Sequence, residues 1–115
     1  MKNAYAPYSG FKVGAAVLCG SGKVYTGCNV ENASFGATNC AERTAVFNAV
    51  SKGESELLKI AVVSSSGKQT NPCGICLQVL SELMPSGSIV LSGKDGILEI
   101  PVSDFLPRTF GSKDF

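Results

Sequence analysis

The sequence contains no histidine and no tryptophan among its 115 residues. Without histidine, a general base must be a carboxylate, a thiol, an amine or a phenol. A zinc site must then be built from cysteine, with aspartate or glutamate as the other available protein ligands. The missing histidine therefore removes most of the catalytic chemistry that depends on an imidazole ring.

Long apolar runs and clustered charge are also missing. No apolar run reaches the roughly 18 residues of a membrane span, and the first ten residues, MKNAYAPYSG, lack the apolar segment of a signal peptide. We therefore expect a cytoplasmic protein without a membrane partner. The 10 basic and 9 acidic residues are scattered and give a net charge of +1, which argues against a nucleic-acid partner.

What the sequence does contain predicts one domain over residues 1–115, since no linker or repeat divides the chain. Apolar alternation on both sides of a Gly-Ser-Gly turn predicts a hairpin, and helical spacing appears after a cap at Thr38 or Asn39. The expected strands are 11–19, 23–31, 59–66, 88–93 and 97–102, and the expected helices are 40–53 and 73–83. This order predicts an α/β fold, a sheet with helices packed on it.

Five cysteines are an odd number, and free thiols or metal ligands are then more plausible than a disulfide framework. Cys73 and Cys76 have the spacing that lets two sulfurs reach one zinc ion, although redox motifs and zinc fingers share it. Cys40 starts the other predicted helix, where the helix dipole favours a thiolate. Cys19 and Cys28 lie in strand-like runs and are interpreted as core residues. Cys28 is also the only plausible fourth ligand for a closed, structural zinc site.

The segment NCAERTA, residues 39–45, places a carboxylate and a guanidinium directly after Cys40. Three thiolates would leave one tetrahedral zinc position open, as in catalytic sites. Glu42 could then move protons beside that position, and Arg43 could offset the negative charge of the sulfurs. The alternative is an ordinary glutamate and arginine on the first turn of a helix.

CAE followed thirty residues later by PCGIC resembles the zinc-dependent nucleoside and nucleobase deaminases, whose signature is H-x-E, or its three-cysteine variant, with PCxxC. Four blocks, AYAPYSGFKVGAA, GCNVENASFG, CAERTA and LPRTFG, are similar to the small, homotetrameric cytidine deaminases. The resemblance implies a three-layer α/β/α sandwich with a five-stranded mixed sheet. It also implies hydrolysis of cytidine and deoxycytidine to uridine and deoxyuridine plus ammonia, in pyrimidine salvage.

The resemblance also implies site residues. One zinc per chain would be held by Cys40, Cys73 and Cys76. Glu42 would take a proton from the attacking water and deliver protons to N3 of the pyrimidine and to the departing ammonia.

The remaining implied contacts concern the nucleoside. Asn29 and Glu31 would bind the ribose hydroxyls, Phe11 would pack near the nucleoside, and the backbone of Ala41 would contact the base. Phe110 would reach the site from a neighbouring subunit, and Phe35 would line a neighbour's site. The alternative for Asn29 and Glu31 is that they are ordinary polar residues of a turn or a strand end. The alternative for Phe35 and Phe110 is packing in the core of their own chain.

Three departures from the family pattern stand out. The N-terminal helix is short or missing, because only three residues precede Ala4. Leu77 stands where relatives often carry arginine, which leaves Arg43 alone beside the thiolates, and Phe35 replaces a usual tyrosine. The open alternatives are a deaminase of another cytosine-bearing small molecule, such as a nucleoside antibiotic, and an inactive zinc-binding member of the family.

Overall fold

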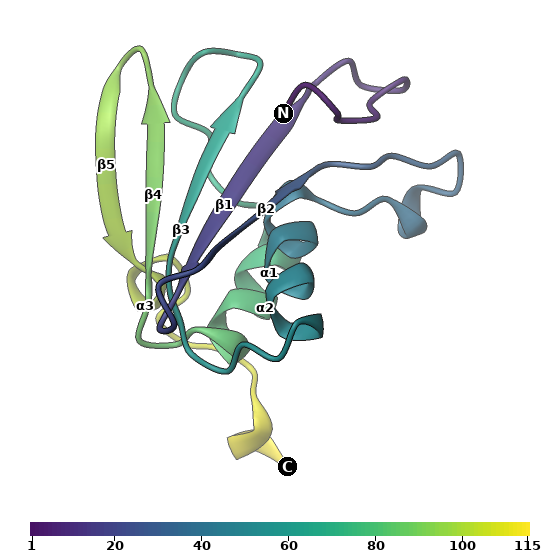
Figure 1. Ribbon diagram of the computed structural model, residues 1–115. Coiled ribbons are helices and arrows are strands. Elements are labelled where there is room, and N and C mark those ends of the chain that lie inside the picture. Colours follow the sequence, from purple (N-terminus) through teal and green to yellow (C-terminus); the bar gives the residue numbers. More distant parts are fainter.

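The computed structural model describes all 115 residues and consists of one sheet with its two main helices on the same side (Figure 1). The strands are β1 Val13–Cys19, β2 Val24–Cys28, β3 Leu57–Ser64, β4 Ser88–Gly93 and β5 Gly96–Pro101. The helices are α1 Ala41–Ser51, α2 Gly74–Leu83 and the short α3 Val102–Phe105, with 3-10 turns at Phe35–Ala37 and Ser112–Asp114.

The five strands have the order β2-β1-β3-β4-β5. β3 and β4 run parallel because α2 carries the chain back between them, and every other neighbouring pair is antiparallel. The sheet is therefore mixed. The α/β class and the five-stranded mixed sheet expected from the sequence are both confirmed.

The core lies between the sheet and the α1–α2 layer. Ile60 and Val62 alternate toward the helices along β3 and are fully buried, as are Ala45 and Ala49 of α1. Leu80 of α2 closes the same cluster. Each fully buried isoleucine, valine or leucine contributes roughly 1.5–3 kcal/mol, so the core firmly fixes both helices against one face.

β2 and α1 approach each other closely at Gly27. A Cβ atom at this position would lie 2.4 Å from the backbone nitrogen of Ala45 and 2.7 Å from the carbonyl oxygen of Ala41. Only glycine allows the strand to lie directly on the helix backbone here. The contact holds the first turns of α1, where Glu42 lies, against the sheet.

The other face of the sheet carries no helix of this chain. Ala16, Ala61 and Val63 alternate toward it and remain partly or well exposed. Residues 1–12 form turns and one bridge between Tyr5 and Val30 rather than a helix. The three-layer α/β/α sandwich implied by the resemblance is therefore represented here by a sheet with its helices on one side.

Several element boundaries differ from those expected. The second strand ends at Cys28 instead of residue 31, because the next residues bridge to Tyr5 and Asn39 instead of β1. Cys40 itself, with an extended backbone, precedes the first turn of α1, so Thr38 and Asn39 were wrong as the cap. Asn39 instead donates a side-chain hydrogen bond to Thr44.

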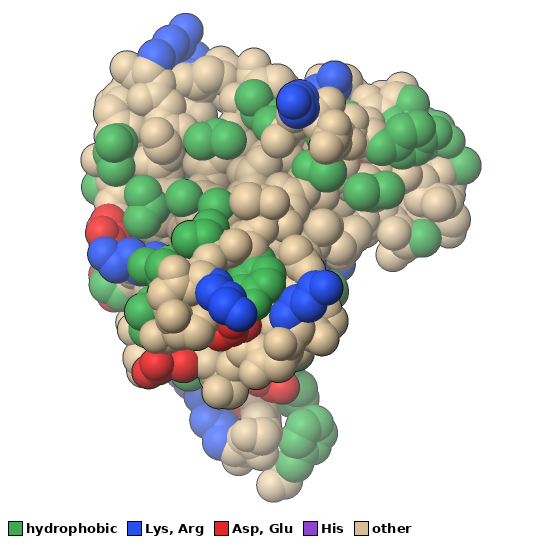
Figure 2. Space-filling model, viewed as in Figure 1, with side chains coloured by type: hydrophobic (Ala, Val, Ile, Leu, Met, Phe, Trp, Pro, Cys, Tyr) green, Lys and Arg blue, Asp and Glu red, His purple; other side chains and the backbone are tan.

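Residues 29–39 form a projecting segment, which we call the arm; it extends to the right of the sheet in Figure 1. On the face seen in Figure 2, basic and acidic side chains are dispersed without a patch of one sign, and hydrophobic side chains gather toward the arm. None of the helices has the length and apolar character needed to cross a membrane.

Candidate metal centre

Three thiols converge where the two main helices begin. Cys40 immediately precedes α1, Cys73 immediately precedes α2, and Cys76 lies in the first turn of α2. Their sulfurs all lie within 4.8 Å of one another, and the Cys40 and Cys73 sulfurs are 3.6 Å apart. Cys19 and Cys28 are outside this group, so Cys28 does not close a four-thiol site.

The chemistry of this donor set fits zinc. Three sulfurs and no fourth protein ligand leave one tetrahedral position for water or substrate, as in catalytic zinc sites. The backbone N–H of Cys76 also donates to the Cys73 sulfur at 3.5 Å, which stabilises a thiolate there. The unpaired N–H groups at the starts of two helices add positive potential from the same side.

The Cys40 and Cys76 thiols differ in acidity. Hydrogen bonds from the Cys76 thiol, from Arg43 and from Cys73 together lower the pKa of Cys40 to about 5, against the effect of burial. The hydrogen bond with Cys40, together with burial, raises the pKa of Cys76. Of these two sulfurs, Cys40 is therefore the one that becomes a thiolate first.

The Arg43 side chain points toward the Cys40 thiolate. Its Nη2 donates to the Cys40 sulfur at 3.4 Å, and its Nε is buried without any hydrogen-bond partner. The guanidinium is partly buried, and the thiolate charge beside it offsets the water that it loses there. Leu77, the departure noted in the sequence, packs against the hydrophobic core and adds no charge.

Glu42 lies on α1 two residues after the first metal-ligand candidate and is only 4% exposed. Burial raises the pKa of its carboxyl group, and the negative charge of Cys40 acts in the same direction. The group also interacts with the Cys76 thiol. A buried carboxyl with a raised pKa beside an open metal position is suited to accept and release a proton.

A second group of predicted residues lies at the base of the arm. The Asn29 side chain accepts a hydrogen bond from the Val13 backbone at 2.9 Å and donates one to the Phe11 carbonyl at 2.7 Å. One N–H of its amide remains available. Val30 and Asn39 exchange two backbone hydrogen bonds of 2.9 Å, which joins this group to the residue before Cys40.

Glu31 belongs to the same group. Its carboxylate accepts hydrogen bonds from the backbone N–H groups of Tyr8 and Ser9 and from the Ser9 hydroxyl. Ser9 was not among the site residues predicted from the sequence. Its only local feature is a turn position before glycine, and its contact with Glu31 spans 22 residues of sequence.

Of the two remaining predicted phenylalanines, Phe35 lines a hollow of about 350 Å³ together with Glu31 and Ser9, whereas Phe110 lies in neither group within one chain. Phe35 is 78% exposed at the tip of the arm, where its ring meets that of Tyr8 at 6.2 Å. Phe110 is 61% exposed in the C-terminal segment and stacks edge to face on Phe115. Ala41, by contrast, is fully buried at the first position of α1, beside the thiols.

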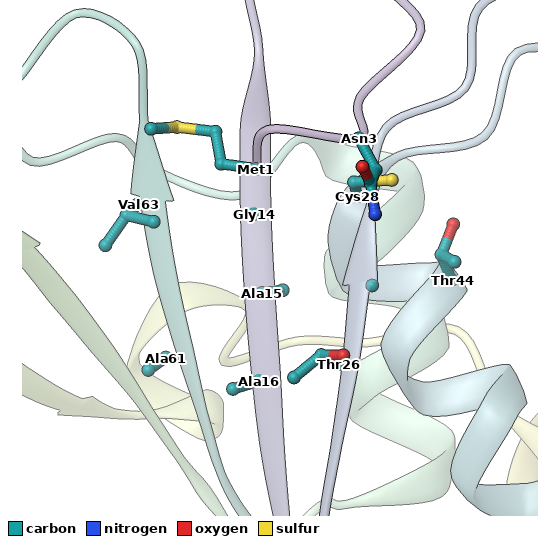
Figure 3. Close-up of a pocket in the computed structure, with 11 residues that line it drawn as sticks. Met1, Asn3, Gly14, Ala15, Ala16, Thr26, Cys28, Thr44, Ala61 and Val63 are labelled. Atoms are coloured by element: carbon teal, nitrogen blue, oxygen red, sulfur yellow. The ribbon is translucent and has the colours of Figure 1, made fainter.

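A separate hollow of about 440 Å³ lies over β1–β3 and contains none of the three converging thiols, although Cys28 lines it. Figure 3 shows Met1 crossing its edge above Gly14, with Val63, Ala61 and Ala16 on neighbouring strands. Most of its lining residues are small and apolar. The hollow therefore holds no cluster of metal ligands or carboxylates like the one formed at the starts of α1 and α2.

Comparison with known proteins gives consistent matches. Residues 1–92 match the family described as the cytidine and deoxycytidylate deaminase zinc-binding region. A cytidine deaminase from Halalkalibacterium halodurans is 49% identical, over 98% of this chain and 87% of that protein. A cytidine deaminase from Sporosarcina psychrophila is 44% identical, over 98% and 85% respectively.

Solved structures agree with these matches. The crystal structure of a cytidine deaminase from Burkholderia pseudomallei superposes with a TM-score of 0.89 at 48% identity, covering 95% of this chain and 89% of that one. A cytidine deaminase from Mycobacterium tuberculosis superposes with a TM-score of 0.83 at 44% identity, covering 96% and 87%. Sequence and fold thus point to the same family.

Proposed function

This chain belongs to the cytidine and deoxycytidylate deaminase family, and on that premise we propose that it hydrolyses the C4 amine of cytidine and deoxycytidine. The products are uridine or deoxyuridine and ammonia, a reaction of pyrimidine salvage. The observation that carries the proposal is the convergence of three thiols beside the buried carboxyl of Glu42. This arrangement supplies an open metal position and a proton carrier in a chain without histidine.

Cys40, Cys73 and Cys76 hold one zinc ion per chain in this proposal. Zinc, when bound, supplies Lewis-acid activation of the attacking water. Arg43 donates to the Cys40 sulfur and so limits the negative charge that three thiolates would otherwise bring to the site.

Glu42 carries the protons. Its raised pKa lets the carboxyl hold the proton taken from the attacking water. Glu42 delivers this proton to N3 of the pyrimidine, then takes the second proton of the same water, from the hydroxyl added at C4, and delivers it to the departing ammonia. Because the side chain is buried, bulk water competes little for these protons.

The group at the base of the arm binds the nucleoside. The free N–H of Asn29 and the carboxylate of Glu31 supply a donor and acceptors for sugar hydroxyls, while Phe11 packs against the nucleoside. The backbone of Ala41 contacts the base. Support comes from the backbone pairing of Val30 with Asn39, which links this group to Cys40.

The active assembly is a homotetramer in this proposal. Phe110 enters the site of a neighbouring subunit and stacks on the pyrimidine, and Phe35 lines a neighbour's site. Their exposed fractions of 61% and 78% support this, because aromatic rings so exposed on one chain are typical of interfaces. The five free thiols support a location in the reducing cytoplasm.

The test is Glu42→Gln, assayed for loss of cytidine absorbance, ammonia release and bound zinc. We expect turnover to fall by about 10²–10⁴-fold or more, with zinc content unchanged at about one ion per chain. Glu82→Gln, on the exposed surface of α2, is the matched control and should keep full activity. Full activity of Glu42→Gln would contradict the proposed mechanism.

A wild-type protein that holds zinc but turns over neither nucleoside would contradict the substrate assignment. In that case, a screen of other cytosine-bearing small molecules for ammonia release would identify the substrate instead. A wild-type protein without zinc would contradict the metal site itself.

A further inference from the structure

The Ser9 hydroxyl makes two hydrogen bonds that connect separate parts of the nucleoside-binding group. It donates to Oε2 of Glu31, and it accepts the backbone N–H of Phe11 at 3.0 Å. Phe11 in turn offers its carbonyl oxygen to the Asn29 amide at 2.7 Å. One hydroxyl therefore connects the Glu31 carboxylate to the backbone of Phe11 and, through the Phe11 carbonyl, to the Asn29 amide.

The Glu31 carboxylate is held from one side. The backbone N–H groups of Tyr8 and Ser9 donate to Oε1 at 2.9 and 3.1 Å, and the Ser9 hydroxyl donates to Oε2. Oε1 accepts two of these hydrogen bonds and Oε2 accepts one, so the site left free for a further donor lies on Oε2. A carboxylate fixed in this way accepts a hydroxyl proton without first losing side-chain rotamer freedom.

The hydrogen bonds also keep the group ionised. The bond from the Ser9 hydroxyl lowers the pKa of Glu31. An ionised carboxylate is a pure acceptor, so the partner that it selects is a donor such as a sugar hydroxyl. The 3′-hydroxyl is the ring hydroxyl that cytidine and deoxycytidine share.

We propose that Ser9 is a positioning residue for sugar recognition, which orients the Glu31 carboxylate toward the 3′-hydroxyl of the nucleoside. The inference rests on the proposed function, because it presupposes a nucleoside in the site. Ser9 does not touch the substrate in this scheme. It acts through Glu31 and, through the backbone of Phe11, holds the neighbouring contacts in register.

The experiment compares cytidine with 3′-deoxycytidine as substrates of the zinc-loaded protein. For Ser9→Ala we expect kcat/KM with cytidine to fall about tenfold, the size of a lost hydrogen bond to a charged group, mainly through a higher KM. With 3′-deoxycytidine the fall should be about twofold or less, because the interaction that Ser9 supports is already absent. Ser9→Thr keeps a hydroxyl and should retain the preference for cytidine.

Ser21 provides a matched control at the far end of β1. Its hydroxyl donates to Glu54 at 3.0 Å and accepts the backbone N–H of Lys23 at 3.3 Å, so it repeats the hydrogen-bond pattern of Ser9 away from the site. Ser21→Ala should leave the kinetics with both substrates unchanged. A Ser9→Ala loss confined to cytidine, together with an unaffected Ser21→Ala, supports the proposal.

Two outcomes would overturn it in distinguishable ways. Equal losses of Ser9→Ala on both substrates, or no loss on either, would refute the positioning role while leaving the deaminase function intact. A wild-type protein that deaminates neither substrate would refute the proposed function, and the role of Ser9 with it.

Discussion

Replacing Gly27 with alanine should displace α1 and damage both the stability and the metal centre. The added Cβ would meet the nitrogen of Ala45 at 2.4 Å and the carbonyl oxygen of Ala41 at 2.7 Å. Favourable contacts of carbon lie near 3.5 Å, so the helix and strand must separate by about 1 Å. These neighbours are backbone atoms and cannot rotate away.

The cost of this substitution lies at the upper end of the range for overpacking. We expect a loss of about 3 kcal/mol in the free energy of unfolding, which corresponds to about 10 °C in Tm for a chain of this size. Because α1 carries Glu42, displacing this helix by about 1 Å should also lower kcat/KM about 100-fold.

Urea denaturation of zinc-loaded protein at a fixed protomer concentration measures the stability, since the stability of an oligomer depends on concentration. Gly36→Ala adds the same methyl group where no atom lies within 4 Å and the backbone angle is ordinary, and it should change stability by less than about 0.5 kcal/mol. Wild-type stability of Gly27→Ala would refute the argument that β2 rests directly on α1.

Three further outcomes are expected. Arg43→Ala should weaken zinc retention about 10–100-fold in competition with a chelator, because it removes the donor to the Cys40 sulfur; unchanged retention would show that the guanidinium does not stabilise the thiolates. Cys28→Ala should keep one zinc per chain while Cys76→Ala loses it, since only the latter sulfur belongs to the converging group, and zinc analysis of the two variants decides this. Glu99 accepts hydrogen bonds from Ser88 and Lys59, and these lower the pKa of its carboxyl group in the folded protein. The ionised carboxylate therefore contributes to folding stability above about pH 4.5, and this contribution is lost as the pH falls through the lowered pKa. The stability difference between wild type and Glu99→Gln in urea should therefore shrink on acidification, and a difference that grows would contradict the assignment.

The sequence alone predicted the order of strands and helices because each element carries a local pattern. A short, nearly continuous apolar run over residues 59–66 predicted β3, and helical spacing after Cys40 and Cys73 predicted α1 and α2. The boundaries were less accurate where distant partners decide them. The second strand ends at Cys28 because its next residues bridge to Tyr5 and Asn39, and neither partner is evident from the local pattern.

The metal ligands could be named from the sequence because their spacing is itself chemical information. PCGIC fixes two sulfurs within one helical turn, and the absence of histidine left cysteine as the main source of further ligands. The start of a predicted helix favoured Cys40 over the two cysteines in strand-like runs, and the resemblance to a known family supported the same choice. That Arg43 points at the Cys40 sulfur, at 3.4 Å, needed the structure, because spacing gave an equal chance of a solvated helix face.

Only the tertiary structure decided which residues support the site from a distance. The Ser9 contact with Glu31, the packing of Gly27 on α1, and the exposure of Phe35 and Phe110 all depend on parts of the chain that are remote in sequence. Local patterns determine what each segment forms, since helix and strand periodicities act over a few residues. Which segments meet is set by the burial of the whole core and by hydrogen bonds between distant parts of the chain.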